Sequence, residues 1–155
     1  MNRPYTFINV AVTADGKMDT FERKGSAISS KKDKERVDQL RGSADENLVG
    51  GRTLLGELPK LTVKSEALRE GRIQRGLLPN PIKVGVVTRA DIPLDSDFIK
   101  AGPARVVIFT TSQTSTLNIE SLRALGVEVF VDDAPRVDLN KMMLTLKKIG
   151  VGHLM

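Results

Sequence analysis

Runs of apolar and β-branched residues recur along the chain, separated by polar, glycine-rich or proline-containing stretches. Continuous apolar runs of this kind are typical of strands that are covered on both faces of a sheet. The pattern therefore predicts short, largely buried strands at the following positions: Tyr5–Val12, Leu48–Gly50, Leu61–Val63, Ile82–Thr88, Val106–Thr110, Val127–Val131 and Val151–Met155.

Helices are predicted between these runs from their end signals. Ser30 followed by Asp33 fits a capping box, which indicates a mostly solvated helix at about Lys31–Arg41. Asp138 is a suitable N-cap for a helix with one apolar stripe, on which Met142 and Met143 are expected to fill the core rather than bind a ligand. Two shorter helices are expected at Thr53–Leu58, which Pro59 ends, and at Leu117–Leu125.

Strands that alternate with helices indicate an α/β fold with a mostly parallel central sheet flanked by helices. At 155 residues the chain has the length of a single domain. Ligands on such sheets bind at the carboxyl ends of the strands. Asp15, Gly51 and Thr88 all lie at the carboxyl ends of predicted strands, so we consider them candidate site positions.

Composition narrows the possible chemistry. Apolar residues make up 40% of the chain and charged residues 28%, with no run that could span a membrane and no signal-peptide pattern, so we expect a soluble, cytoplasmic protein. The chain has no cysteine, which excludes disulfides and thiol nucleophiles. His153 is the single histidine, which argues against a histidine metal site, and no metal is expected.

The net charge of +5 and the pI near 9.6 favour anionic partners, either phosphorylated small molecules or nucleic acid. Arg69, Arg72 and Arg75 are spaced to follow one face of a short helix, which we interpret as a solvated surface segment. Aromatic residues make up only 4% of the chain, so the stacking platforms of single-strand binders are scarce. Nucleic acid is therefore the less favoured partner.

Two short polar segments are candidates for binding or catalysis. The chain has no G-x-G-x-x-G fingerprint and no P-loop, but Gly50–Thr53 fits either a phosphate-binding helix start or an ordinary tight turn. Asp15 and Lys17 flank Gly16 in a polar turn, which is either a surface turn or a pair that orients a substrate and protonates it.

The order of these segments resembles the pyrimidine reductases of riboflavin biosynthesis, both the reductase domain of the RibD type and its stand-alone counterparts. The resemblance rests on NVAVTADGK, SAIS, LVGGRTLL, PKLTVK and NPIKVGVVT in register, and it extends to the last residue. It implies a dihydrofolate-reductase-like three-layer fold. It also implies NADPH-dependent reduction of the ribosyl chain of a ribosylaminopyrimidine 5′-phosphate, and a homodimer.

The resemblance also implies roles for individual residues. Lys17 matches a position that holds the substrate, and together with Asp15 it is the candidate catalytic pair. Substrate contacts are implied for Ser26, Arg41, Leu61 and Lys64. Cofactor contacts are implied for Asn9, Ala11, Gly51, Thr53, Glu57 and Thr88, with Asn9 and Ala11 on the strand under the nicotinamide.

Three features depart from the family pattern. Glu57-Leu58-Pro59 stands in place of Asp-Asp-Pro, and Lys64 stands in place of an arginine. The family continues beyond a strand that matches Val151–Met155, so we expect the domain to be incomplete at its C-terminus. Two alternatives stay open, namely a related reductase with another substrate, dihydrofolate included, and a non-catalytic basic module that binds nucleic acid.

Overall fold

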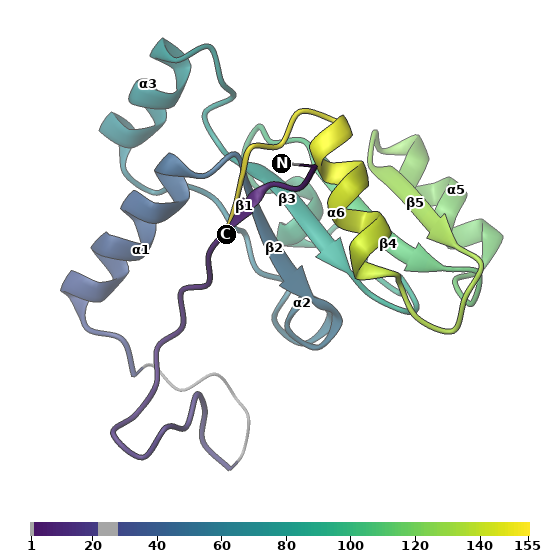
Figure 1. Cartoon of the computed structure of the whole chain (residues 1–155), viewed down its shortest axis with the longest axis horizontal. Coiled ribbons are helices and arrows are strands. Elements are labelled where there is room, and N and C mark those ends of the chain that lie inside the picture. The colour runs from purple at the N-terminus through teal and green to yellow at the C-terminus, as the bar shows by residue number, and fades with distance from the viewer. Residues whose placement is uncertain (1, 22–27) are drawn as a thin grey trace.

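Within the described residues, 2–21 and 28–155, six parallel strands form one sheet in the order β1-β6-β2-β3-β4-β5 (Figure 1). This computed structural model confirms the predicted α/β class with a parallel sheet. The last strand of the chain lies between the first two. The strand bounds are β1 Tyr5–Thr6, β2 Glu46–Gly50, β3 Ile82–Val86, β4 Val106–Thr111, β5 Glu128–Asp132 and β6 His153–Leu154.

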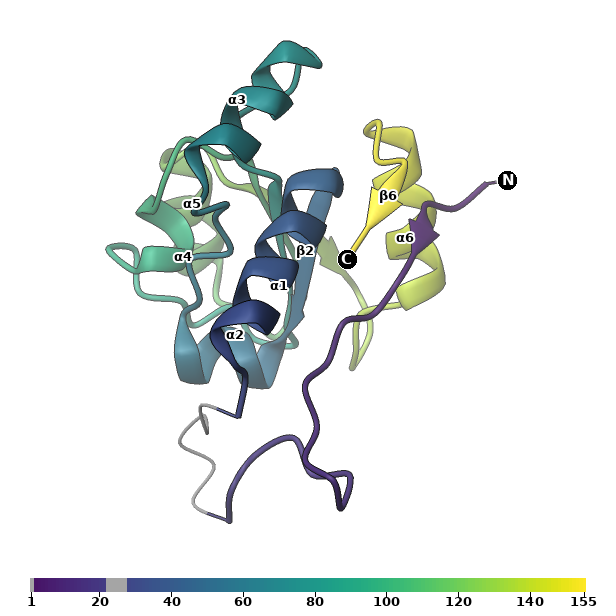
Figure 2. The same cartoon turned by 90° about the vertical axis from the view of Figure 1, so that its left-hand side faces the viewer.

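Helices cover both faces of the sheet (Figure 2). Helix α6 packs on one face, where Met142 and Leu146 join a core with Val84. On the opposite face, Leu54 of α2 and Phe98 of α4 belong to a second core. The helix bounds are α1 Lys31–Ser43, α2 Gly51–Glu57, α3 Glu66–Gln74, α4 Asp97–Lys100, α5 Thr116–Ala124 and α6 Leu139–Lys148. None of the helices in the described part of the chain has the length and apolar character to cross a membrane.

The predicted helix ends are confirmed where a side chain caps the helix. Ser30 Oγ accepts a hydrogen bond from the Asp33 amide at 3.1 Å at the start of α1. Asp138 Oδ1 accepts from the Asn140 amide at 2.8 Å at the start of α6. Each cap pairs an amide that the helix itself leaves without an acceptor, which is why these residues favour helix starts.

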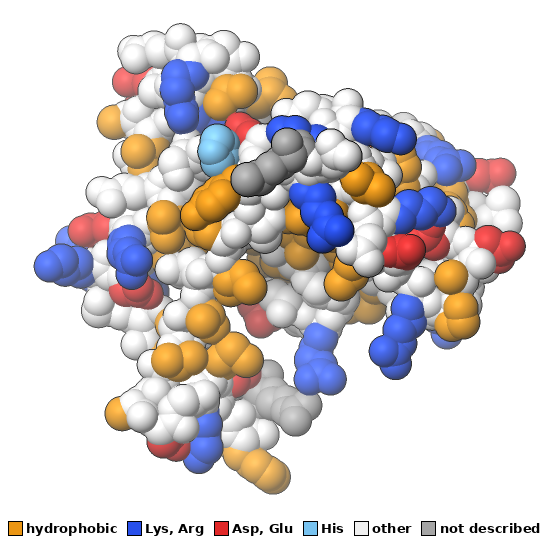
Figure 3. Space-filling view, viewed as in Figure 1, with side chains coloured by type: hydrophobic (Ala, Val, Ile, Leu, Met, Phe, Trp, Pro, Cys, Tyr) orange, Lys and Arg blue, Asp and Glu red, His pale blue; other side chains and the backbone are white. Residues whose placement is uncertain are grey.

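The prediction of a strand over Tyr5–Val12 is wrong for most of its length, because only Tyr5–Thr6 pairs with another strand. The amides of Tyr5 and Phe7 donate to carbonyls of the β6 segment, at 2.8 and 3.0 Å, and pairing ends there. Residues 7–12, which we call the arm, extend away from the sheet and carry hydrophobic side chains on the surface (Figures 1 and 3). Asn9 and Ala11 therefore lie beyond β1 rather than on a strand.

The predicted strand at Leu61–Val63 is also absent, since this segment is irregular in the structure. Leu61 has a φ of 50°, in the left-handed region, which breaks the extended conformation that a strand requires. Side chains replace the missing strand bonds: Asn47 Nδ2 donates to the Leu61 carbonyl at 3.3 Å, and Asn80 Oδ1 accepts from the Val63 amide at 2.9 Å.

The prediction that Arg69, Arg72 and Arg75 belong to a solvated surface segment is wrong for Arg72, which is only 2% exposed. Its guanidinium donates to the carbonyls of Leu78 at 2.9 Å and of Ala44, at the end of α1, at 2.5 Å. Arg69 and Arg75 likewise donate to backbone carbonyls. These arginines fasten α3 to its surroundings, because helix ends leave carbonyl groups that need donors.

Two buried charged residues lie on the adjacent strands β2 and β3, with their side chains on opposite faces of the sheet. Lys83 of β3 donates from Nζ to carbonyls at the end of α4, at 3.0 Å to Phe98 and 2.6 Å to Ala101. Burial lowers the pKa of Lys83 to about 8. Glu46 of β2 is fully buried and neither carboxyl oxygen has a hydrogen-bond partner among the described residues. Burial, with a contribution from nearby Asp45, raises the pKa of Glu46 to about 8.

Candidate active site

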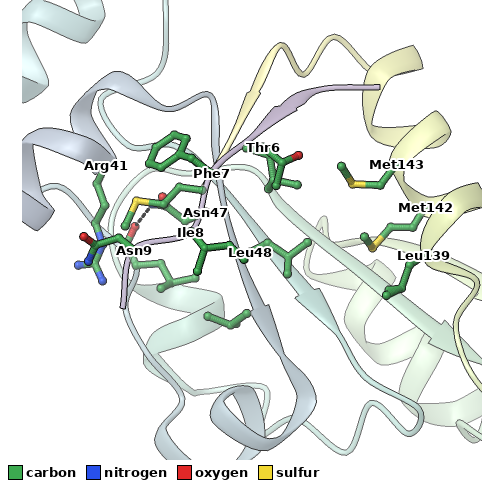
Figure 4. Close-up of a pocket in the computed structure, with 14 residues that line it drawn as sticks. Thr6, Phe7, Ile8, Asn9, Arg41, Asn47, Leu48, Leu139, Met142 and Met143 are labelled. Atoms are coloured by element: carbon green, nitrogen blue, oxygen red, sulfur yellow. Dashed lines mark hydrogen bonds between the residues drawn. The ribbon is translucent and has the colours of Figure 1, made fainter. Parts of the chain in front are cut away.

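A cavity of about 470 Å³ opens where the arm leaves the sheet, between the arm, β2 and α6 (Figure 4). We call it the edge cavity. Its lining combines segments that are distant in sequence: Thr6–Asn9, Arg41, Asn47–Val49, Leu61, Leu139, Met142–Met143 and Leu154–Met155. Three of the residues predicted from the sequence, Asn9, Arg41 and Leu61, are thereby brought together.

The edge cavity exists because β6 pairs with only the beginning of β2. The Met155 amide donates to the Glu46 carbonyl at 3.1 Å, and the Leu48 amide donates to the Met155 carbonyl at 2.8 Å. Beyond these bonds, the same edge of β2 through Gly50 has no paired strand among the described residues. The arm diverges on the other side, so a gap remains between two backbone segments.

Arg41 supplies the positive charge of the edge cavity. It lies in the last turn of α1, is partly buried, and has no hydrogen-bonded acceptor among the described residues. Asp38, one turn earlier in α1, does not pair with Arg41, because its carboxylate accepts hydrogen bonds from the amides of Lys64 and Ser65, both at 2.8 Å. Burial lowers the pKa of Arg41, while the charge of Asp38 opposes this shift. An arginine remains protonated at neutral pH in spite of such a shift, so Arg41 can bind an anion.

Asn47 is a cavity residue that the sequence analysis missed. Its side chain is 3% exposed, and Nδ2 donates to the Leu61 carbonyl at 3.3 Å, the bond drawn in Figure 4. Asn47 Oδ1 has no hydrogen-bond partner among the described residues. The available signal was a polar residue directly before the apolar strand end at Leu48, in a strand expected to be buried.

Leu139, Met142 and Met143 were also not predicted as site residues. The prediction that both methionines fill the core is supported, since Met142 is buried and Met143 packs against the same cluster. They line the cavity because α6 packs on the sheet close to the arm. The local sequence does not predict this tertiary contact.

The start of α2 is the candidate phosphate-binding element. Gly50 occupies the N-cap position without a side-chain cap, so the first amides of α2 remain available to an anion. A Cβ on Gly51 would approach Val87 Cγ2 at 3.0 Å, which shows why a glycine allows α2 to start so close to β3. Arg52 and Thr53 are exposed in the first turn and add a cation and a hydroxyl. This set of donors fits the phosphates of a dinucleotide.

The remaining residues predicted to contact the cofactor, Glu57, Thr88 and Ala11, do not line the edge cavity. Glu57 is exposed in the last turn of α2. Thr88 follows β3, and its carbonyl accepts from the hydroxyls of Thr110 at 3.1 Å and Thr111 at 2.8 Å. Ala11 lies on the arm beyond the part that lines the cavity.

Asp15 and Lys17 form an exposed turn separate from the edge cavity. Lys17 Nζ lies 2.9 Å from Asp15 Oδ2, and the Thr13 amide closes the turn by donating to the Lys17 carbonyl at 2.8 Å. The pKa of Asp15 is lowered by hydrogen bonds from Thr13 first and then Lys17, so its carboxylate is ionised at neutral pH. Lys64 is exposed next to Asp38, and Ser26 lies outside the described residues.

Among the described residues, no three His, Cys, Asp or Glu side chains gather in a way that could hold a metal ion. The arrangement instead offers an arginine, an amide oxygen and an apolar wall in the edge cavity, with an anion-binding helix start at the end of the same strand, β2. Such a site suits a phosphorylated ligand of mixed polar and apolar character.

Comparison with known proteins identifies relatives over nearly the whole chain. The RibD C-terminal domain model matches residues 4–155. The 2,5-diamino-6-ribosylamino-4(3H)-pyrimidinone 5′-phosphate reductase of Archaeoglobus fulgidus is 37% identical over 153 residues, covering 99% of this chain and 69% of the relative. The protein of the same description from Methanothermobacter thermautotrophicus is 33% identical, covering 99% of this chain and 66% of the relative. The chain thus spans about two thirds of the length of these relatives.

Solved structures share the fold at lower identity. A pyrimidine reductase-like protein from Corynebacterium diphtheriae superposes with a TM-score of 0.79 at 19% identity, covering 99% of this chain and 64% of that one. A diaminohydroxyphosphoribosylaminopyrimidine deaminase/5-amino-6-(5-phosphoribosylamino)uracil reductase from Thermotoga maritima gives a TM-score of 0.71 at 23% identity, covering 99% of this chain and 38% of that one. These likenesses support the dihydrofolate-reductase-like architecture expected from the sequence.

Proposed function

This chain belongs to the RibD C-terminal domain family, and from that membership we propose that it reduces 2,5-diamino-6-ribosylamino-4(3H)-pyrimidinone 5′-phosphate with NADPH. The product would carry a ribityl chain in place of the ribosyl group, as riboflavin biosynthesis requires. The observation that carries the proposal is 37% identity over 99% of the chain to a reductase of that description. We further propose that the reaction takes place in the cytoplasm.

The cations of the site are suited to a sugar phosphate. Arg41 in the edge cavity and exposed Lys64, which lies next to Asp38 of the same helix as Arg41, can share the phosphate charge. Leu61 contributes an apolar contact to the pyrimidine side of the ligand. Lys17, whose Nζ lies 2.9 Å from Asp15 Oδ2, is proposed to donate a proton to the substrate when the turn approaches the bound sugar.

The cofactor is proposed to bind across the carboxyl ends of β2 and β3. Gly51 and Thr53 at the start of α2 would hold phosphate groups, while Glu57, Thr88, Asn9 and Ala11 would contact the remainder. When bound, the nicotinamide supplies the hydride for reduction of C1′ of the opened ribose. The chain then has to align donor and acceptor and to exclude water, and neither task needs a cysteine or a metal.

The proposal is tested with the full-length protein by following NADPH consumption in the presence of the diaminopyrimidine substrate. Arg41→Ala should lower kcat/KM by about 10- to 100-fold, because a charge-assisted contact to phosphate is lost. Lys17→Ala should lower kcat by about 100-fold or more through loss of the proton donor. NADPH affinity, measured by fluorescence titration, should stay nearly unchanged in both variants.

Thr53→Ala serves as the matched variant on the cofactor side, because it should weaken NADPH binding and leave substrate binding nearly intact. Dihydrofolate is the control substrate, for which no turnover is expected. A protein that binds no NADPH, or that reduces dihydrofolate in preference to the pyrimidine, would contradict the proposed function. Full turnover by Lys17→Ala would contradict the role given to that residue.

We also propose a homodimer that pairs through the β1 side of the sheet. The support is the hydrophobic surface along the arm, where Ile8 is 88% exposed and Val10 and Val12 are also exposed. Sedimentation velocity should give the mass of two chains, and Ile8→Glu should shift the protein toward one. A wild-type protein that stays monomeric at high concentration would exclude this proposal.

A further inference from the structure

We propose that Asn47 determines substrate specificity in the edge cavity by accepting a hydrogen bond from the 2-amino group of the pyrimidine. This inference rests on the proposed function, because it names the group that distinguishes one ribosylaminopyrimidine phosphate from another. No role in binding follows for Asn47 from the sequence motifs considered above.

The orientation of the Asn47 amide is fixed by its surroundings. Nδ2 donates to the Leu61 carbonyl at 3.3 Å, so a reversed amide would place Oδ1 against that carbonyl, acceptor against acceptor. Leu61 is itself held in an unusual left-handed conformation with a φ of 50°. The carboxamide oxygen is therefore the group that remains to be paired.

A buried acceptor without a partner lowers stability, so such groups are uncommon in folded proteins. Asn47 Oδ1 is one of the few in the described residues, and Asn47 lines the edge cavity. Ser96 Oγ is another buried oxygen without a partner, but it does not line this cavity. A ligand that donates an N–H to Asn47 would satisfy an acceptor that the protein leaves unpaired.

The rest of the cavity defines what kind of ligand could do this. Arg41 places a cation at the same cavity as the Asn47 oxygen, and apolar side chains of Leu48, Leu139 and Met142 line much of the remainder (Figure 4). The cavity thus suits a flat, partly apolar ring with a hydrogen-bond donor on one side and an anionic or oxygen-rich substituent on another. An aminopyrimidine that carries a sugar phosphate has these features.

Two related reductases act on compounds that differ in the substituent at position 2 of the pyrimidine ring. The Archaeoglobus fulgidus protein is described by a 2,5-diamino-pyrimidinone, and the Thermotoga maritima protein by a 5-amino-uracil. Position 2 carries an amino group, a donor, in the first compound and a carbonyl oxygen, an acceptor, in the second. Asn47 Oδ1 attracts the donor and repels the acceptor, so this chain should prefer the diamino compound.

The test is calorimetric binding of the two ribosylaminopyrimidine phosphates to the full-length protein without NADPH. Wild type should bind the diamino compound about 10-fold or more tightly than the uracil compound, because a buried acceptor discriminates strongly against a like group. Asn47→Leu, which is similar in size, should abolish this preference. Asn47→Ala, which removes the acceptor without adding a larger apolar group, should abolish it as well, and thermal unfolding of both variants checks that they are folded.

Ser96→Ala is the matched control, because it removes another unpaired buried oxygen outside the cavity. It should leave the preference at the wild-type value. The inference is overturned if a folded Asn47→Leu or Asn47→Ala variant keeps the wild-type ratio, or if wild type binds the two compounds equally or not at all. Preferential binding without NADPH consumption would contradict the proposed reduction and leave the role of Asn47 supported.

Discussion

Glu46 and Lys83 show that burial of a charged residue has different consequences when its partners differ. Lys83 has three backbone carbonyls within hydrogen-bond distance at the end of α4, so its ammonium group is compensated. Glu46 has no hydrogen-bonded donor among the described residues, and its pKa is raised to about 8. A carboxyl group in this position is therefore favoured in its neutral form.

This shift predicts a pH-dependent stability with a defined sign. The pKa of Glu46 is about 8 in the folded chain and 4.5 when unperturbed, so the folded state holds a proton that the unfolded state releases. The free energy of unfolding should fall as the pH rises from 4.5 to 8, by up to about 1.4 kcal/mol per pH unit from this residue. Glu46→Gln should remove that part of the slope.

Urea denaturation at several pH values within this interval measures the effect. Glu120→Gln is a suitable control, because Glu120 is exposed on α5 and its substitution should leave the slope unchanged. An identical pH dependence of wild type and Glu46→Gln would show that the carboxyl group of Glu46 is not protonated in the folded protein.

The contribution of individual residues to the site could be predicted only in part. Arg41 and Leu61 were identified from the order of motifs, and both line the edge cavity. Asn47 was not, since a polar residue at the beginning of a strand is unremarkable until its burial is known. Arg72 was misread for the same reason: the sequence shows a guanidinium but not the carbonyls that it reaches.

At the scale of elements, the buried guanidinium of Arg72 holds α3 against the end of α1. Arg72 donates to carbonyls of Gly42 at 3.3 Å and Ala44 at 2.5 Å, where α1 ends, and to Leu78, which follows α3. Leu68 of α3 also packs against Gly42, where an added Cβ would lie 3.4 Å from its side chain. The position of α1 matters for function because Arg41 lies in its last turn.

Arg72→Lys should therefore destabilise the protein by about 2 kcal/mol, because an ammonium group cannot reach three carbonyls in the planar arrangement of a guanidinium. Arg36→Lys is the control, since Arg36 is exposed on α1 and should change stability little. Chemical denaturation of the two variants gives the comparison. Equal stabilities would mean that Arg72 does not fasten α3 to α1.

The capped starts of α1 and α6 were predicted correctly, whereas two strands were not. A helix end is determined locally, as when Ser30 pairs the Asp33 amide. A strand depends on a neighbour that the local sequence does not reveal. The residues of the arm have a strand-like sequence but no paired strand beyond Phe7 among the described residues, and residues 61–63 bond to side chains instead.

At the scale of the whole molecule, the alternation of strands and helices was sufficient to predict the fold class but not the assembly of the site. The edge cavity joins the arm, the end of α1, the middle of β2 and the first turns of α6. These segments are brought together by the insertion of β6 between β1 and β2, an order that local patterns cannot specify.

Asp45, directly before β2, holds the start of β6 in place. Its Oδ2 accepts from the amides of Gly152 at 2.8 Å and His153 at 2.7 Å, which anchors the start of β6 beside the start of β2. Asp45→Ala should loosen β6 and, with it, β1. Hydrogen exchange at the Tyr5 and Phe7 amides should accelerate by about 10-fold or more, because two charge-assisted hydrogen bonds are lost.

Asp133→Ala is the matched control, because Asp133 is a carboxylate near the other edge of the sheet, beyond β5. It should leave exchange at Tyr5 and Phe7 unchanged. Exchange that is equally slow in Asp45→Ala and wild type would show that β6 is held by its strand pairing alone.

The position of β6 also has a consequence for how the protein folds during synthesis. β1 pairs only with β6 among the described strands, so residues 5–6 must wait for residues 153–154, almost the whole length of the chain later. The sheet from β2 to β5 can form earlier as the ribosome proceeds, while the hydrophobic arm has nowhere to pair. Such long-range closure makes folding slow. The nascent chain is therefore most in need of a chaperone at residues 5–12, until residues 153–154 emerge.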